Sequence, residues 1–134
     1  MGRASGVLLA VSSLPNSYGI GTFGKEAYDF IDFLVRTKQR YWQVLPLTTT
    51  SYGDSPYQSF SAAAGSPYYI DLKDLEKLGY LKSDDFEDVS FGTSKTCIDY
   101  GALFVNHRRL LNRAFDRFVQ DVPADFEKFC HDQA

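Results

Sequence analysis

The first 46 residues change their hydrophobic pattern twice. Residues 7–11 are five consecutive apolar residues, a run typical of a short strand buried on both faces. Over about residues 24–38 an apolar side chain recurs every three or four positions, which predicts a helix packed on one face. These apolar positions are Ala27, Phe30, Ile31 and Leu34. Residues 41–45 predict a second strand, which ends at Pro46 because proline cannot donate a hydrogen bond within a sheet.

A strand, a helix and a strand in succession predict a βαβ unit with two parallel neighbouring strands and a right-handed crossover. Two long loops leave the carboxyl ends of these strands, at residues 12–24 and 48–65. Ligands of α/β folds bind beyond these strand ends. We therefore expect the two loops to lie side by side on one face and to carry the site.

The second half of the chain is expected to be mainly helical. After a segment expected to be extended at residues 68–72, a helical turn begins near Leu75 and stops at Gly79. A long helix is predicted over about residues 102–119, and Pro123 suits the first turn of another. The apolar stripe of the long helix contains Leu103, His107, Leu110, Leu111, Ala114, Phe115 and Phe118.

The last predicted helix carries Phe126, Phe129 and Cys130 on one face, and no later residue of the chain covers them. Parallel sheets are normally buried on both faces, so two strands are too few for an independent domain. We therefore expect this chain to be a piece of a larger protein. Its uncovered apolar surface would favour self-association.

Composition and charge argue against several classes of partner. The chain has 134 residues, a hydrophobic content of 44% and a net charge of −3, which does not suit nucleic acid. Its densest basic segment, residues 108–117, also contains an acidic side chain and reads as a solvated helix face. No apolar run approaches the ~18–20 residues needed to cross a bilayer, so no membrane partner is predicted.

The histidines and cysteines predict no metal site and no disulfide framework. Cys97, Cys130, His107 and His131 lack the spacing of metal ligands, and two cysteines are too few for a disulfide scaffold. We expect no cofactor, no metal and a cytoplasmic location. His107 lies among leucines at helical spacing and is expected to be a core histidine with satisfied polar atoms, whereas His131 is expected to be solvated.

Residues 19–24 read Gly-Ile-Gly-Thr-Phe-Gly and match the G-x-G-x-x-G pattern of dinucleotide-binding folds. Two features oppose that interpretation. Seven loop residues separate Val11 from Gly19, whereas the first glycine of the nucleotide motif lies at the end of a strand. The ribose-binding acid expected about 20 residues later is missing. We interpret these glycines as shaping a tight loop and the entry to the helix.

Aromatic residues make up 16% of the chain and are concentrated between Tyr41 and Tyr69. Residues 52–62 combine turn formers with two tyrosines, a phenylalanine and an amide, which can present flat apolar faces and hydrogen-bonding groups to one ligand. This mixture suits a sugar better than a metal, a phosphate or a nucleic acid. The candidate binding residues are Tyr52, Asp54, Ser55, Tyr57 and Gln58. Each has a structural alternative, since the tyrosines could pack within the loop and Asp54 could cap a turn.

Cleavage or transfer at a glycosidic bond requires two carboxylates that face the reacting carbon. The predicted strand ends supply no such pair. The nearest acids, Asp71 and Asp74, read as a strand terminus and a helix start. If this protein acts on glycosidic bonds, its catalytic carboxylates are expected beyond residue 134.

Five segments resemble the N-terminal quarter of the amylomaltases, the 4-α-glucanotransferases of glycoside hydrolase family 77. Residues 12–15 read Ser-Ser-Leu-Pro, residues 18–21 read Tyr-Gly-Ile-Gly, and residues 39–47 read Gln-Arg-Tyr-Trp-Gln-Val-Leu-Pro-Leu. The tyrosine-rich run 52–62 is the most specific of the five, and residues 98–101 read Ile-Asp-Tyr-Gly.

Three positions depart from the family pattern. Ala10 stands where many members carry histidine, Ser66 replaces a usual asparagine, and residues 48–51 replace a turn that contains glycine and proline. These departures concern the polar contacts of the first loop and the rigidity of the turn.

The resemblance implies the N-terminal portion of an eight-stranded β/α barrel of the TIM type. Residues 1–80 would hold the first βαβ unit with a substrate-contact loop at 48–67, and residues 81–134 would hold the start of a helical insertion. It also implies transfer of α-1,4-glucan segments between maltooligosaccharides with retention, by carboxylates on later strands: an aspartate nucleophile, a glutamate acid/base and a second aspartate.

The resemblance also assigns residues of this chain to substrate contact. Ser55 and Tyr57 match positions that line the active-site groove, and Tyr52 and Tyr100 match tyrosines of an outer glucan-contact site. We therefore expect the chain to supply substrate-binding loops to a 4-α-glucanotransferase and to be inactive alone. The alternatives are a stand-alone, non-catalytic glucan-binding module and a glycoside hydrolase on the same scaffold, in which water accepts the glucosyl unit.

Overall fold

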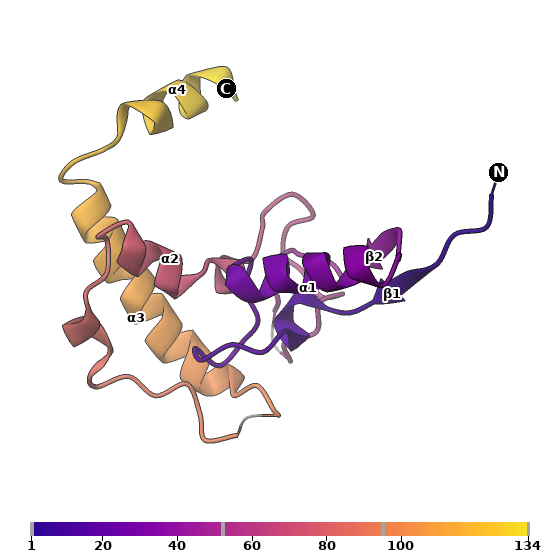
Figure 1. Ribbon diagram of the computed structural model, residues 1–134. Coiled ribbons are helices and arrows are strands. Elements are labelled where there is room, and N and C mark those ends of the chain that lie inside the picture. Colours follow the sequence, from indigo (N-terminus) through magenta and orange to yellow (C-terminus); the bar gives the residue numbers. More distant parts are fainter. Residues whose placement is uncertain (1, 52, 95, 134) are drawn as a thin grey trace.

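The fold begins with a two-stranded parallel sheet bridged by a helix. The computed structural model describes residues 2–51, 53–94 and 96–133. Strands β1 (Gly6–Leu8) and β2 (Tyr41–Gln43) pair in parallel, and helix α1 (Lys25–Arg36) connects them along the sheet (Figure 1). The predicted βαβ unit is confirmed.

The first strand is shorter and more exposed than the sequence predicted. It ends at Leu8, and Val11 begins a 3-10 turn (Val11–Ser13) in place of continuing the strand. Leu8 is 59% exposed, so burial on both faces was wrong for this strand. The physical reason is that the sheet formed by the described residues has two strands, and no neighbouring layer covers both of their faces.

Helix α1 packs one narrow face against the first loop and the apolar side chains next to the sheet. Gly24 is its N-cap, and Ala27 and Leu34 are buried as predicted. Ala27 joins Val11 and Leu14 in a small core against which other apolar side chains pack. Ile31, predicted to lie on the buried face, is 44% exposed, so the buried face is narrower than the apolar spacing indicates.

Residues 68–72 were expected to be extended, but only Ile70 and Asp71 have extended backbone angles, and they separate two helical pieces. These pieces are a 3-10 turn (Pro67–Tyr69) and helix α2 (Leu72–Lys77). Ser66 caps the first by accepting a hydrogen bond from the Tyr68 amide, and Asp71 caps the second by accepting one from the Asp74 amide, at 3.0 Å. Asp71 is therefore a helix cap and not a strand terminus.

Glycine and aspartate set the bounds of the remaining helices. Gly79 has a φ of +82° and ends α2 as predicted. Helix α3 (Tyr100–Phe118) begins after its N-cap, Asp99, whose carboxylate accepts a hydrogen bond from the Ala102 amide. A second core lies between α2, α3 and the segment that joins them, and consists of Leu72, Leu81, Leu110 and Ala114.

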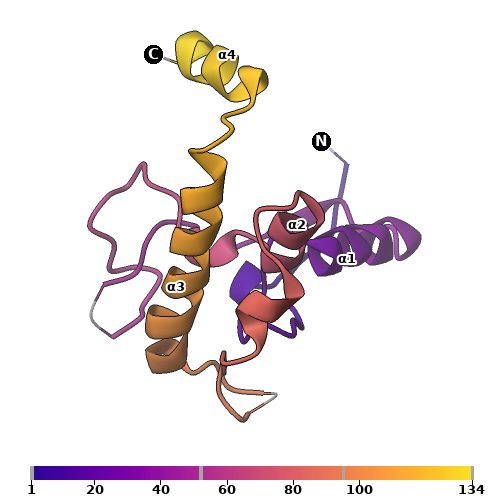
Figure 2. The ribbon, with the colours of Figure 1, turned by 90° about the vertical axis from the view of Figure 1, so that its left-hand side faces the viewer.

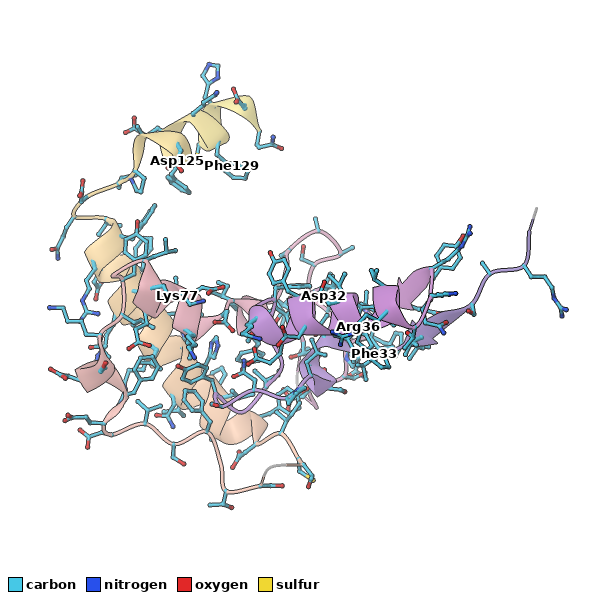
Figure 3. All side chains as sticks on the ribbon, in the orientation of Figure 1. Asp32, Phe33, Arg36, Lys77, Asp125 and Phe129 are labelled. Carbon is cyan, nitrogen blue, oxygen red and sulfur yellow. The ribbon has the colours of Figure 1, made fainter. Side chains whose placement is uncertain are left out.

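Helix α4 (Ala124–Asp132) follows its N-cap, Pro123, and projects beyond the end of α3 (Figure 2). The Phe126 ring contacts Phe118 at a centroid distance of 5.0 Å. Phe129, labelled in Figure 3, is 60% exposed. The apolar face predicted on this helix therefore exists and stays largely uncovered in the described chain.

A buried polar contact ties the first loop to the start of α2. The Thr22 hydroxyl donates to the Asp71 carboxylate at 2.5 Å and accepts a hydrogen bond from the Asn16 side chain at 3.1 Å. Next to it, the Phe23 amide donates to the Tyr69 carbonyl at 3.1 Å. Thr22 and Asp71 are both buried, so this contact, the Thr22–Asp71 clamp, fixes loop 12–24 against residues 69–71.

The glycines of loop 19–24 are required by close packing. A Cβ on Gly24 would lie 2.1 Å from an Asp71 carboxylate oxygen, and one on Gly21 would lie 2.0 Å from the Val11 carbonyl oxygen. Gly19 has a φ of +83°, a conformation that favours glycine. The interpretation of a tight loop and helix entry is confirmed, because protein atoms occupy the space beside the glycines.

Two titratable side chains lie in the helical core. His107 is fully buried, as expected, but neither ring nitrogen has a hydrogen-bond partner among the described residues, although the Ile70 backbone is near enough to favour the protonated ring. The hydrogen-bond geometry of the described residues therefore does not bear out satisfied polar atoms, and the Ile70 backbone is the nearest candidate partner. Burial lowers the pKa of His107 to about 4. Asp85 accepts hydrogen bonds from both terminal nitrogens of Arg117, which lower its pKa to about 2.

We expect Thr22→Val to lower the free energy of unfolding of the natural protein that carries this sequence by about 1–3 kcal/mol. The valine fills the same space but leaves the buried Asp71 carboxylate without its hydroxyl donor. Denaturant titration followed by circular dichroism measures the change. Thr22→Ser is the matched control, because it keeps the hydroxyl and should lose less. Equal stability of the valine variant and the wild type would contradict the clamp.

We expect the free energy of unfolding to fall in two steps as the pH decreases. The folded-state pKa of His107 is about 4, below its ordinary 6.5, so the unfolded chain binds the proton first and stability is lost between these values. This step amounts to about 3 kcal/mol. Asp85 adds a second loss between its ordinary pKa of 3.8 and about 2, where its ion pair is broken.

Denaturation midpoints measured from pH 7 to pH 2 test both steps. The His107→Leu variant should lose the step between pH 6.5 and 4 and keep the more acidic one. The Asp85→Asn variant should keep the step between pH 6.5 and 4 and lose the step between pH 3.8 and 2. An unchanged slope between pH 6.5 and 4 in the leucine variant would assign that step to other groups.

Candidate functional site

A hollow of about 810 Å³ lies between the loop after β2 and the first turns of α3. We call it the tyrosine hollow and define it by the side chains of Asp54, Phe60, Tyr68, Tyr100 and Phe104, which line it. Threonine and serine residues 49–51 and the small residue Gly101 complete its walls. The hollow therefore combines aromatic faces, hydroxyl groups and one carboxylate.

Backbone hydrogen bonds close the loop that forms one wall. Thr48 and Gly65 form an isolated antiparallel bridge, and the Ser66 amide donates to the Leu47 carbonyl at 2.8 Å. Within the loop, the Asp54 amide donates to the Ser51 carbonyl at 3.0 Å, and Asp54 has a φ of +55°. Aspartate tolerates this left-handed conformation in turns. The backbone of Asp54 therefore belongs to a turn that places it at the hollow, whereas capping of the turn by its carboxylate stays a prediction.

The opposite wall comes from the N-terminus of α3. Tyr100 is the first residue of that helix, and Phe104 follows four residues later, one turn along the same face. The Tyr68 ring, from the 3-10 turn before α2, lies 6.3 Å from the Tyr100 ring at an interplanar angle of 59°. Two elements far apart in sequence therefore supply a pair of neighbouring tyrosines.

The electrostatics keep both tyrosines neutral. Burial raises the pKa of Tyr68, and the nearby Asp54 carboxylate raises it further, partly offset by Arg108. Burial also raises the pKa of Tyr100, with added effects from Tyr69 and Asp54. Both hydroxyls therefore stay protonated at neutral pH, where each can donate and accept a hydrogen bond.

The sequence-predicted residues divide between the hollow and the turn beside it. Tyr100 and Asp54 line the hollow. Ser55, Tyr57 and Gln58 form the adjacent turn, in which the Gln58 amide donates to the Ser55 carbonyl at 3.0 Å. Tyr57 is 73% exposed, so its ring is free to meet a ligand outside the hollow. Tyr52 lies outside the residues that the structure describes.

Sequence reasoning missed Tyr68, Phe60 and Phe104. Phe104 carried a usable signal, because it follows Tyr100 by one helical turn. Phe60 lay within the candidate run without being selected. Tyr68 was assigned to an extended segment, and no sequence pattern indicated that its ring would face Tyr100.

A second hollow, of about 630 Å³, lies between the first loop and residues 91–98. Ser13, Asn16 and Thr93 line it together with Ile20 and Phe91. The loops at 12–24 and 48–65 therefore line different hollows, and their common ligand-binding face stays a prediction.

The described parts of the chain contain no cluster of metal-ligating side chains and no helix able to span a membrane. Across residues 2–51, 53–94 and 96–133, no three or more His, Cys, Asp or Glu side chains are grouped to hold a metal ion. None of the helices described is both long enough and apolar enough to cross a membrane. Asp71 and Asp74, the nearest acids to a catalytic pair, cap α2 and pair with Lys77, respectively.

Comparisons with known proteins agree with one another. The sequence profile of glycoside hydrolase family 77, described as 4-alpha-glucanotransferase, matches residues 9–134. A 4-alpha-glucanotransferase of Streptococcus pneumoniae is 58% identical over 132 residues, which cover 97% of this chain and 26% of that protein. One of Thermus thermophilus is 48% identical over 128 residues, which cover 95% of this chain and 25% of that protein.

The structural comparison gives the same result. An amylomaltase from Streptococcus agalactiae, solved in complex with acarbose, matches with a TM-score of 0.91 at 48% identity, over 98% of this chain and 27% of that chain. The chain thus spans about a quarter of the length of the relatives it matches. Because sequence profile, relatives and fold coincide over nearly all of its residues, the chain belongs to the 4-alpha-glucanotransferase family, glycoside hydrolase family 77.

Proposed function

We propose that this chain supplies glucan-binding loops to a cytoplasmic enzyme that transfers α-1,4-glucan segments between maltooligosaccharides with retention. The observation that carries the proposal is the tyrosine hollow, where Tyr68 and Tyr100 place aromatic faces beside neutral hydroxyls. Aromatic faces pack against the C–H surface of a sugar ring, and hydroxyls pair with its polar edge. The names of the relatives, all 4-alpha-glucanotransferases, point to the same substrate class.

In this proposal the βαβ unit within residues 1–80 begins an eight-stranded barrel, and residues 81–134 begin a helical insertion. Retention requires two carboxylates about 5 Å apart, one as nucleophile and one as acid/base. Among the described residues no such pair of acids lines the tyrosine hollow, since Asp54 is the acid that they contribute to its lining. The catalytic carboxylates are accordingly assigned to residues outside 1–134.

The residues of this chain would act on the acceptor and on the bound chain, not on the bond itself. Tyr57 and Ser55 would orient sugar at the active-site groove, with Gln58 as a further hydroxyl partner. Tyr100 and Tyr52 would hold a more distant part of the glucan, beside Asp54. A sugar held in this way excludes water, so its 4-hydroxyl and not water would accept the glucosyl unit from the covalent intermediate.

The purified 134-residue chain should release no glucose and form no longer glucans from maltotriose, whereas the natural protein that carries this sequence should do both. The reason is that the chain lacks the paired carboxylates. Chromatography of the products measures both, and circular dichroism checks that the chain is folded. Product formation by the isolated chain would contradict the assignment. Hydrolysis without longer products by the natural protein would favour a glycoside hydrolase.

Tyr100→Ala and Tyr57→Ala should each raise the KM of the natural protein for long α-1,4-glucan by about three- to tenfold, because each removes one aromatic contact. Initial transfer rates at varied glucan concentration provide the measurement. Tyr28→Ala is the matched control, since Tyr28 is 67% exposed on α1 and Tyr57 is 73% exposed. An unchanged KM in the Tyr100 variant would remove the tyrosine hollow from substrate binding.

A further inference from the structure

One buried side chain links the helical core to the tyrosine hollow. His107 lies on α3 seven residues after Tyr100, two turns along the same helix, and none of its surface is exposed. Its ring meets the Tyr68 ring at a centroid distance of 5.7 Å and an interplanar angle of 83°. Tyr68 in turn meets Tyr100 at 6.3 Å. Three rings therefore form a row from the core to the wall of the hollow.

Packing of an apolar stripe does not by itself account for histidine at this position. The neighbouring buried positions of α3, Leu103 and Leu110, carry leucine. A leucine at 107 would bury its side chain without removing polar nitrogens from water, whereas both nitrogens of His107 are buried without a hydrogen-bond partner in the described chain. Histidine differs from leucine in its ring nitrogens, which lie near the Ile70 backbone, and in its flat ring, which is the part that meets Tyr68.

The flat ring has a specific use at this contact. Perpendicular ring pairs at this separation are a favourable arrangement. The Tyr68 amide makes a local hydrogen bond to the Ser66 hydroxyl at 3.4 Å, which holds the backbone and not the ring. The orientation of the Tyr68 side chain therefore depends on the rings at its two sides.

We infer that His107 is a positioning residue for glucan binding, whose flat ring fixes the orientation of the Tyr68 ring beside Tyr100 at the wall of the tyrosine hollow. The inference rests on the proposed function of that hollow. His107 does not line the hollow and would not touch the glucan, so it acts through Tyr68.

The test uses the natural protein that carries this sequence and compares His107→Leu with His107→Phe. The leucine variant should raise the KM for long α-1,4-glucan about fivefold, because Tyr68 loses its perpendicular partner. The phenylalanine variant keeps a flat ring and should restore the KM to near the wild-type value. A KM in the phenylalanine variant as high as in the leucine variant would overturn the inference.

Leu110→Val is the control for a merely structural effect. Leu110 is also fully buried on α3, but it packs in the core with Leu72 and Leu81. This variant should lower the thermal midpoint and leave the KM unchanged. If His107→Leu behaves in the same way, the side chain has only a structural role. Should the leucine variant fail to fold, His107→Gln takes its place, since it is polar, of similar length and without a ring.

A double-variant cycle separates this inference from the proposed function. With Tyr68→Ala already present, His107→Leu should cause no further rise in KM, because no ring remains to be held. An additive rise would overturn the positioning role. An unchanged KM in Tyr100→Ala would reject the hollow as a binding site and the inference with it. A raised KM in Tyr100→Ala with no effect of His107→Leu would reject the inference and leave the proposed function in place.

Discussion

The buried carboxylate of Asp71 connects three parts of this structure. It accepts the Thr22 hydroxyl from the first loop and the Asp74 amide at the start of α2. It also packs so closely on Gly24, the N-cap of α1, that no side chain fits there. A carboxylate taken out of water needs such partners, because an unpaired buried charge is strongly unfavourable. One group thus fixes a loop and the starts of two helices relative to one another.

The tyrosine hollow depends on the same constraint. Asp71 ends the short connection that follows the 3-10 turn Pro67–Tyr69, so fixing it also fixes where Tyr68 leaves the backbone. The hydrogen bond from the Phe23 amide to the Tyr69 carbonyl adds a second attachment at that turn. Tyr68 then lies between His107 and Tyr100, both on α3. A buried polar clamp therefore holds one side of the tyrosine hollow, and a long helix holds the other.

Local patterns in the sequence predicted the elements whose causes are local. The βαβ unit and α3 follow from apolar spacing, and both are present. Residues 68–72 were predicted as extended because aromatic and β-branched residues favour strands. The side-chain caps at Ser66 and Asp71 stabilise two helical elements there and outweigh that preference. Burial of β1 on both faces could not be judged from the strand alone, since it depends on which layers lie against the sheet.

The difference between local and long-range causes also applies to the site. Tyr100 and Asp54 were found because a sequence motif contains them, and both line the hollow. Tyr68 and His107 were not found because their roles arise from the packing of α3 against a turn more than thirty residues away. The contact between them also explains a feature that the apolar stripe left open, namely a polar ring in a row of leucines. Sequence spacing identified His107 as buried, and only the fold shows which ring it meets.

The charge around the hollow indicates which sugars suit it. The Asp54 carboxylate raises the pKa of both Tyr68 and Tyr100, which means that its field extends over the hydroxyls of the wall. Arg108 opposes this field at Tyr68 alone. A phosphorylated or acidic sugar would bring a second negative charge into that field, at a cost that a neutral glucan does not incur. In the proposed function, the aromatic faces and neutral hydroxyls of the wall would therefore suit an uncharged α-1,4-glucan better than a charged sugar.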